Sequence, residues 1–88
     1  MSDTGLKITE QRGSVYGPFC ENARVAQKLK FIFRSTSRWG DLTDSQREAL
    51  DLIALKVSRI LTGNDSSYPD NWVDISGYAD LIVKELNT

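Results

Sequence analysis

The residues best suited to bind a ligand are a few charged side chains that helical spacing places beside apolar neighbours. Lys56 and Arg59 fall in an otherwise apolar segment, and Asp74 stacks with Tyr78 in a later one. A charge beside apolar groups is costly unless it has a partner. Either a cation pairs with Asp74 and fixes the register of two helices, or these groups face a cavity. In the second case a nucleotide would be bound by Lys56, Arg59, Asp74, Tyr78 and Asn71.

Three acidic residues form a candidate metal site. Glu48 and Asp51 lie three residues apart and could share a Mg²⁺ ion, to which Glu21 would add an oxygen ligand. The alternative for the first two is a solvent-exposed strip in which Arg47 pairs with Asp51. The alternative for Glu21 is a favourable interaction with a helix N-terminus.

Composition excludes several classes of function. The 88-residue chain has no His, which removes His-based catalysis and the usual zinc sites, and its one Cys, Cys20, cannot form an internal disulfide. Lys plus Arg number 11 and Asp plus Glu number 12, so the net charge of −1 argues against a nucleic-acid binder. No signal peptide or bilayer-spanning apolar run is visible, so we expect a cytoplasmic protein without a membrane partner.

The spacing of apolar residues predicts three helices. They span about Pro18 to Ser35, Asp44 to Thr62, and about Asn71 to Leu86. Residues 1–13 show no sustained period and are expected to form a flexible N-terminal arm, which leaves residues 14–88 as a single helical domain.

Several residues indicate where these helices begin and end. Thr43 and Gln46 fit a capping box before the second helix. Gly63 is expected to end that helix in the left-handed conformation, and Asp70 to cap the third. Gly77, inside the third helix, indicates a close helix crossing or a ligand approach, because Gly there costs roughly 1 kcal/mol relative to Ala.

The central helix is apolar around most of its circumference. Arg47, Asp51 and Ser58 form its one narrow polar strip, which we expect to face solvent. A helix apolar on most sides must be covered on most sides, and two further helices from so short a chain cannot readily do this. The sequence therefore predicts an all-α three-helix domain that completes a helical bundle by self-association, most simply as a two-fold dimer.

Three segments resemble a family of short, uncharacterised bacteriophage and prophage proteins. The motifs are Y-G-P-x-x-E-N at residues 16–22, K-x-x-R-I-L-T-G at 56–63 and D-N-W-x-D-I-x-G-Y-A at 70–79. The resemblance implies a phage origin and a place in the bacterial host cytoplasm. More distantly, the chain is similar to MazG-type all-α nucleotide pyrophosphohydrolases, which use Mg²⁺ to cut nucleoside triphosphates. Of their first acidic motif, E-E-x-x-E, this chain has only Glu21.

These observations lead to two expected functions. The first is a phage accessory protein that binds a nucleotide or nucleotide signal at Lys56, Arg59 and Asp74, and hydrolyses it if the acidic residues hold a metal. The second is a non-enzymatic phage factor that docks on a host protein, including a defence protein. It would use Trp39, Tyr68 or the basic face of the first helix. Nucleic-acid contact is a third expectation, carried by a local cluster of Arg24, Lys28, Lys30, Arg34 and Arg38.

Overall fold

The computed structural model describes residues 18–88 and places them in three α-helices joined by short loops. The helices are α2 (Phe19–Arg34), α3 (Asp44–Thr62) and α4 (Pro69–Leu86), and a short 3-10 turn, η1 (Trp39–Asp41), follows α2. Residues 18–88 contain no strand. The predicted all-α three-helix fold is therefore confirmed. The arm expected at residues 1–13 lies outside the described residues, as do residues 14–17.

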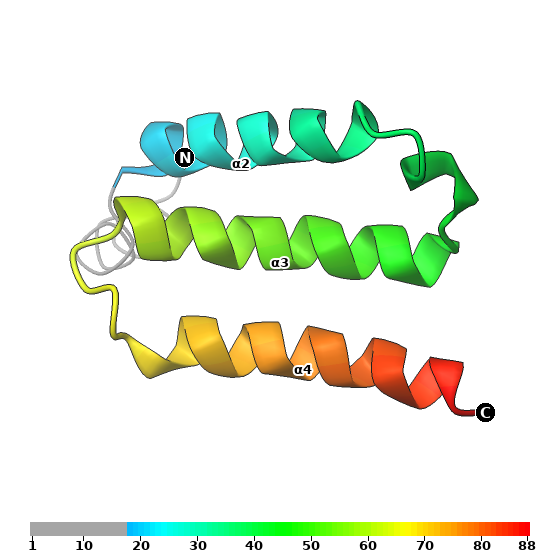
Figure 1. Cartoon of the computed structure of the whole chain (residues 1–88). Coiled ribbons are helices and arrows are strands. Elements are labelled where there is room, and N and C mark those ends of the chain that lie inside the picture. The colour runs from blue at the N-terminus through cyan, green and yellow to red at the C-terminus, as the bar shows by residue number, and fades with distance from the viewer. Residues whose placement is uncertain (1–17) are drawn as a thin grey trace, which may run out of the picture.

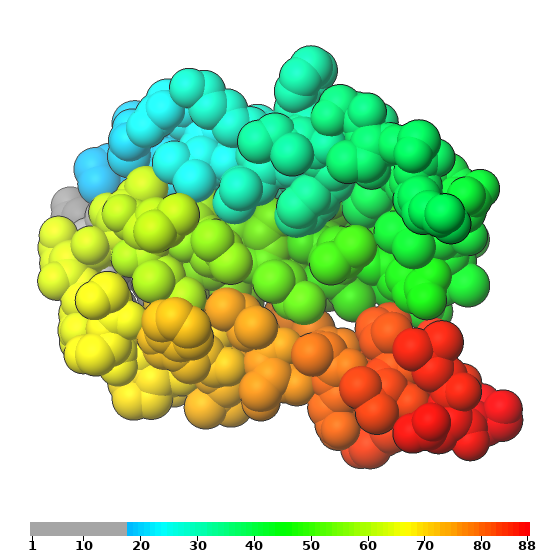
Figure 2. All heavy atoms as spheres, viewed as in Figure 1, coloured from blue at the N-terminus to red at the C-terminus, as the bar shows by residue number. Residues whose placement is uncertain are grey.

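The helix α3 lies between the other two, and consecutive helices run in opposite directions (Figure 1). One side of α3 packs against α2 and another against α4, and within the described residues no comparable contact joins α2 to α4. In the space-filling view the three helices form one continuous surface with α3 in its middle (Figure 2). The sides of α3 that face neither neighbour are therefore left open by this part of the chain.

The start of α3 is fixed by the predicted capping box. The Gln46 backbone N–H donates to the Thr43 hydroxyl at 3.1 Å, and the Thr43 N–H donates to the Gln46 side-chain oxygen at 2.9 Å. Both bonds satisfy backbone donors that the first turn of a helix leaves unpaired. The predicted first residue, Asp44, is correct because this local chemistry is complete within four residues.

The two predictions on the α3–α4 connection are wrong. Gly63 has φ −81° and ψ 174°, so the chain leaves α3 in an extended conformation and needs no left-handed residue. The helix α4 begins at Pro69 with Tyr68 as its N-cap, two residues before the expected cap at Asp70. Proline fits the first helical position, because its fixed φ is helical and no N–H is needed there. Asp70 instead lies in the first turn, where a carboxylate favours the helix dipole.

The buried core of residues 18–88 is built from small side chains. The buried apolar residues are Ala26, Ala49 and Ala54, and the buried polar ones are Asn22, Ser58 and Asn71. In contrast, ten large apolar side chains of the described residues are each at least 36% exposed. Because apolar burial is the main stabilising force in folding, this part of the chain retains unused capacity to bury surface against a partner.

Candidate functional site

The polar strip of α3 is covered by α2 and not by solvent. Two guanidinium nitrogens of Arg34 donate to the two carboxylate oxygens of Asp51, at 3.1 and 2.8 Å. Ser58 is fully buried, and its hydroxyl donates to the Leu55 carbonyl at 2.6 Å. The expectation of a solvent-facing strip with an Arg47–Asp51 pair is wrong, because α2 supplies polar partners to this strip. The strip therefore holds two helices together.

The described residues of the three motifs, at the start of α2, the end of α3 and the start of α4, lie at the same end of the helical layer (Figure 1). The Thr62 hydroxyl of α3 lies within hydrogen-bonding distance of the Asn22 side chain of α2, and it donates to the Ser58 carbonyl at 2.7 Å. Asn71, in the first turns of α4, is 2% exposed. Buried polar groups of this kind select which helix faces meet, because a wrong pairing would leave them without partners. This end of the domain therefore specifies the fold.

The predicted ligand residues Lys56 and Asp74 are brought together. The Lys56 Nζ lies 2.9 Å from an Asp74 carboxylate oxygen, and the lysine side chain is 12% exposed against 42% for the aspartate. The pair links α3 to α4, as the first of the two alternatives for these charges requires. Arg59 is half-buried on α3, and Asn71 is too enclosed for a ligand to reach without rearrangement.

A shallow depression of about 340 Å³ lies next to this ion pair. It is lined by Asp74, Gly77, Tyr78 and Leu81 of α4. A Cβ atom added at Gly77 would meet nothing within 4 Å, so Gly77 does not serve a close helix crossing. The predicted close helix crossing at Gly77 is therefore wrong, and the approach of a ligand over its backbone stays a prediction. The depression is wide enough for a small ligand, although pockets that bury ligands are usually deeper.

The three predicted metal ligands lie in different surroundings. Glu21 accepts a hydrogen bond from Arg24 Nε at 3.1 Å, and this bond holds the pKa of the Glu21 carboxyl below its usual value. The Asp51 carboxylate is bound by Arg34, and Glu48 is exposed. Between residues 18 and 88, no three His, Cys, Asp or Glu side chains gather closely enough to hold a metal ion. The described structure thus offers a Mg²⁺ ion no ready ligand set.

The aromatic loop residue Trp39 is packed and half-buried. Its ring stacks on Phe33 with centroids 5.8 Å apart, and the Arg34 guanidinium lies 4.8 Å from the Trp39 ring centroid. Arg47 donates to the Trp39 carbonyl at 3.1 Å and to the Gly40 carbonyl at 2.8 Å. These contacts tie η1 to both α2 and α3, so Trp39 organises the loop. Because its ring is half-buried in these contacts, Trp39 offers little surface for the predicted contact with a host protein.

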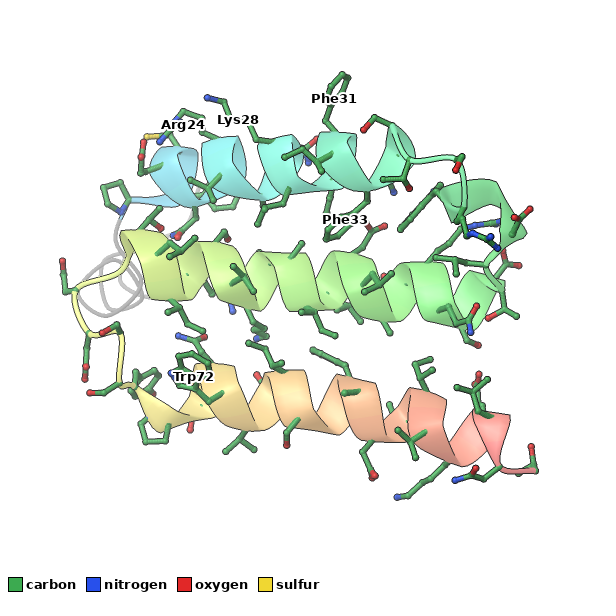
Figure 3. The ribbon with its side chains drawn as sticks, viewed as in Figure 1. Arg24, Lys28, Phe31, Phe33 and Trp72 are labelled. Atoms are coloured by element: carbon green, nitrogen blue, oxygen red, sulfur yellow. The ribbon has the colours of Figure 1, made fainter. Side chains whose placement is uncertain are left out.

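A more accessible surface is the outer strip of α2, which consists of Arg24, Lys28 and Phe31. These residues are spaced at i, i+4 and i+7, and all three project away from α3 (Figure 3). Phe31 is 75% exposed, whereas Phe33 points toward α3 and is half-buried. The two cations were among the predicted contact residues and Phe31 was not, because large apolar side chains of a helix are usually part of the core.

A second exposed surface, which we call the apolar face, includes the side of α3 that lies opposite its charged residues. Its six large side chains come from all three helices and are at least 36% exposed. They are Ile32 of α2, Leu50 and Leu61 of α3, and Trp72, Val83 and Leu86 of α4. At ~100° per residue, the Trp72 and Leu86 positions lie on the flank of α4 opposite Asp74 and Leu81. The apolar face and the depression therefore lie on opposite sides of the layer.

The fold and these surfaces define a small all-α domain of three antiparallel helices, whose helix contacts are ion-paired and whose large apolar side chains are exposed. The chain belongs to the family described as a domain of unknown function, DUF6378, whose model matches residues 2–86. No curated protein and no solved structure matches the chain. Among the described helices, none has the length and apolar character needed to cross a bilayer.

Proposed function

We propose that this chain is a non-enzymatic protein-binding factor of phage origin, which acts in the bacterial cytoplasm as a homo-oligomer and docks on a host protein through the outer strip of α2. The observation that carries the proposal is the exposure of Phe31, which is 75% accessible on the side of α2 that faces away from the domain. Aromatic residues and Arg are enriched in protein interfaces and dominate their binding energy.

The surroundings of Phe31 fit a helix that inserts one side into a groove. Arg24, Lys28 and Phe31 have the i, i+4, i+7 spacing of such anchors. The Arg24 guanidinium is held by Glu21 through Nε, which orients it before a partner arrives. A groove with an apolar floor and an acidic rim would complement this strip, since Phe31 would fill the floor and Lys28 would meet the rim.

The experiment is a quantitative comparison of host proteins captured by three forms of the full chain: wild type, Phe31→Ala and Val73→Ala. Val73 is the control, because it is 63% exposed on α4, away from the outer strip. We expect at least one host protein whose capture is lost with Phe31→Ala and kept with Val73→Ala. With the purified partner, Phe31→Ala should raise the Kd about 30-fold, equivalent to ~2 kcal/mol. If no captured protein depends on Phe31, the proposal is wrong.

A second candidate function, nucleotide binding, is favoured by the depression beside the Lys56–Asp74 pair. Its ligand would stack on Tyr78, half-buried in the depression, and approach over Gly77. A bound ligand raises thermal stability by mass action. Melting the chain against nucleoside triphosphates and cyclic nucleotides, with and without Mg²⁺, should then give a rise in Tm. Gly77→Leu should abolish that rise, because it fills open space within the depression. Identical melting curves with and without every nucleotide would eliminate this candidate.

A further inference from the structure

We infer that the apolar face is where a second copy of this chain binds, so that two three-helix layers pack face to face across a two-fold axis. This inference rests on the homo-oligomer of the proposed function and assigns its interface, and it concerns a different surface from the docking strip, since Phe31 is not on the apolar face. It begins from the core described above: in residues 18–88 the buried apolar side chains are three alanines, while ten large apolar side chains are exposed and the others are half-buried.

The layout of α3 explains why one face is left apolar. The strip of Ala54, Ser58 and Thr62 faces α2, because Thr62 lies against Asn22 there. Lys56 faces α4, because it pairs with Asp74. Between these two directions, on one side of the helix, run Leu50, Ile53, Val57 and Leu61, spaced at i, i+3, i+7 and i+11.

The flanking helices extend this apolar strip on both sides. Because the helices are right-handed and antiparallel to α3, the Ile32 position of α2 turns to the same side of the layer. The positions of Trp72, Val83 and Leu86 on α4 do so as well. The Trp72 indole N–H donates to the Ser66 carbonyl at 2.8 Å, which fixes the ring at the start of α4 (Figure 3). The Trp72 ring is thus held before association, and burying it against a partner costs little side-chain entropy.

The area of this face matches what a stable dimer needs. The 18 residues of α4 give a length of roughly 27 Å at ~1.5 Å per residue. Three helices about 9 Å apart give a similar width. Each copy would therefore bury on the order of 700 Å², close to the ~800 Å² per partner of a standard stable interface.

The chemistry of the face favours a second copy over an unrelated protein. The strip of α3 that holds Leu50 and Leu61 also contains the half-buried Ile53 and Val57 and carries no charge, and apolar faces of this kind are typical of permanent homodimers. Because the buried apolar residues of 18–88 are only alanines, this part of the chain gains most from a partner that is always present, and a second copy is made at the same time and in the same amount. With a net charge of −1 per chain, two copies repel each other only weakly.

The test is the mass of the full chain in solution by analytical ultracentrifugation at micromolar concentration. Wild type should sediment at twice the 9.9 kDa chain mass. Leu61→Glu should give the monomer mass, because it places a charge in the apolar face. Val73→Glu should remain dimeric, because Val73 is 63% exposed against 67% for Leu61 but lies off that face.

A second measurement keeps the inference testable if Leu61→Glu unfolds. The photo-crosslinking residue benzoylphenylalanine is placed at position 61 or 73, both exposed in the single chain. Irradiation should give a covalent dimer from position 61 and monomer from position 73. A monomer mass for wild type, or equal cross-linking at both positions, overturns the inference. Neither outcome concerns Phe31, so a monomer mass would remove the homo-oligomer from the proposed function, while docking through the outer strip of α2 would stand or fall by its own test.

Discussion

Replacing Ala54 with Leu is expected to destabilise the domain by about 2 kcal/mol and to lower its Tm by roughly 8–16 °C. Ala54 is 1% exposed and shares its strip of α3 with Ser58 and Thr62, which face α2. These small side chains let the two helices approach closely. A leucine at this position would push α2 away and stretch the Arg34–Asp51 ion pair. The change is measured by thermal and urea unfolding at a fixed protein concentration, because association would make Tm concentration-dependent.

The control for this substitution is Gln27→Leu, which adds a leucine at an exposed position of α2. It should change the stability by no more than ~0.5 kcal/mol. If Ala54→Leu is as stable as the control, the space between α2 and α3 must be loose enough to admit three further carbon atoms. The close α2–α3 contact described above would then be wrong.

The sequence allowed correct prediction wherever the deciding groups lie within a few residues of one another. The start of α3 was correct because the Thr43–Gln46 capping box is complete in one turn. The start of α4 was missed because two local signals compete there. Asp70 is a good N-cap, but Pro69 fits the first helical position better, so the helix begins two residues earlier than a cap at Asp70 allows.

The errors in the polar residues have a common cause, which is that their partners lie on another helix. Asp51 and Ser58 read as solvent-facing because polar residues on a helix usually are. Asp51 is paired with Arg34, which is 17 residues away in the sequence, and Thr62, one turn after Ser58, lies against Asn22, which is 40 residues away. Periodicity measures one helix at a time, and it therefore cannot show that two polar strips complement each other.

The candidate site could also be predicted only in part, because its contacts join different helices. The sequence placed Lys56 and Asp74 near each other because both occupy apolar surroundings, and the structure brings them to 2.9 Å. It could not decide whether they neutralise each other, nor show that ten large apolar side chains are exposed while alanines are buried. Both depend on the path of the chain in space. Helix α2 covers the polar strip of α3, which leaves the apolar strip for a partner.

The Lys56–Asp74 pair leads to an unequal effect of removing its two charges. Asp74→Asn should destabilise the domain by about 1–3 kcal/mol, because it leaves the Lys56 ammonium, only 12% exposed, without a countercharge. Lys56→Met should cost less than about 1 kcal/mol. Methionine keeps the apolar stem, and the Asp74 carboxylate left behind is 42% exposed and stays hydrated.

Urea unfolding of the two single variants and of the double variant Lys56→Met/Asp74→Asn measures this asymmetry as a double-mutant cycle. The double variant should recover most of the stability that Asp74→Asn loses, since it removes the charge that was left unpaired. Recovery would assign the pair a structural role in setting the register of α3 against α4. Equal losses in both single variants, with no recovery in the double, would mean that the two charges are solvated independently. The Lys56 ammonium could then bind an anion, and this result would support the nucleotide candidate.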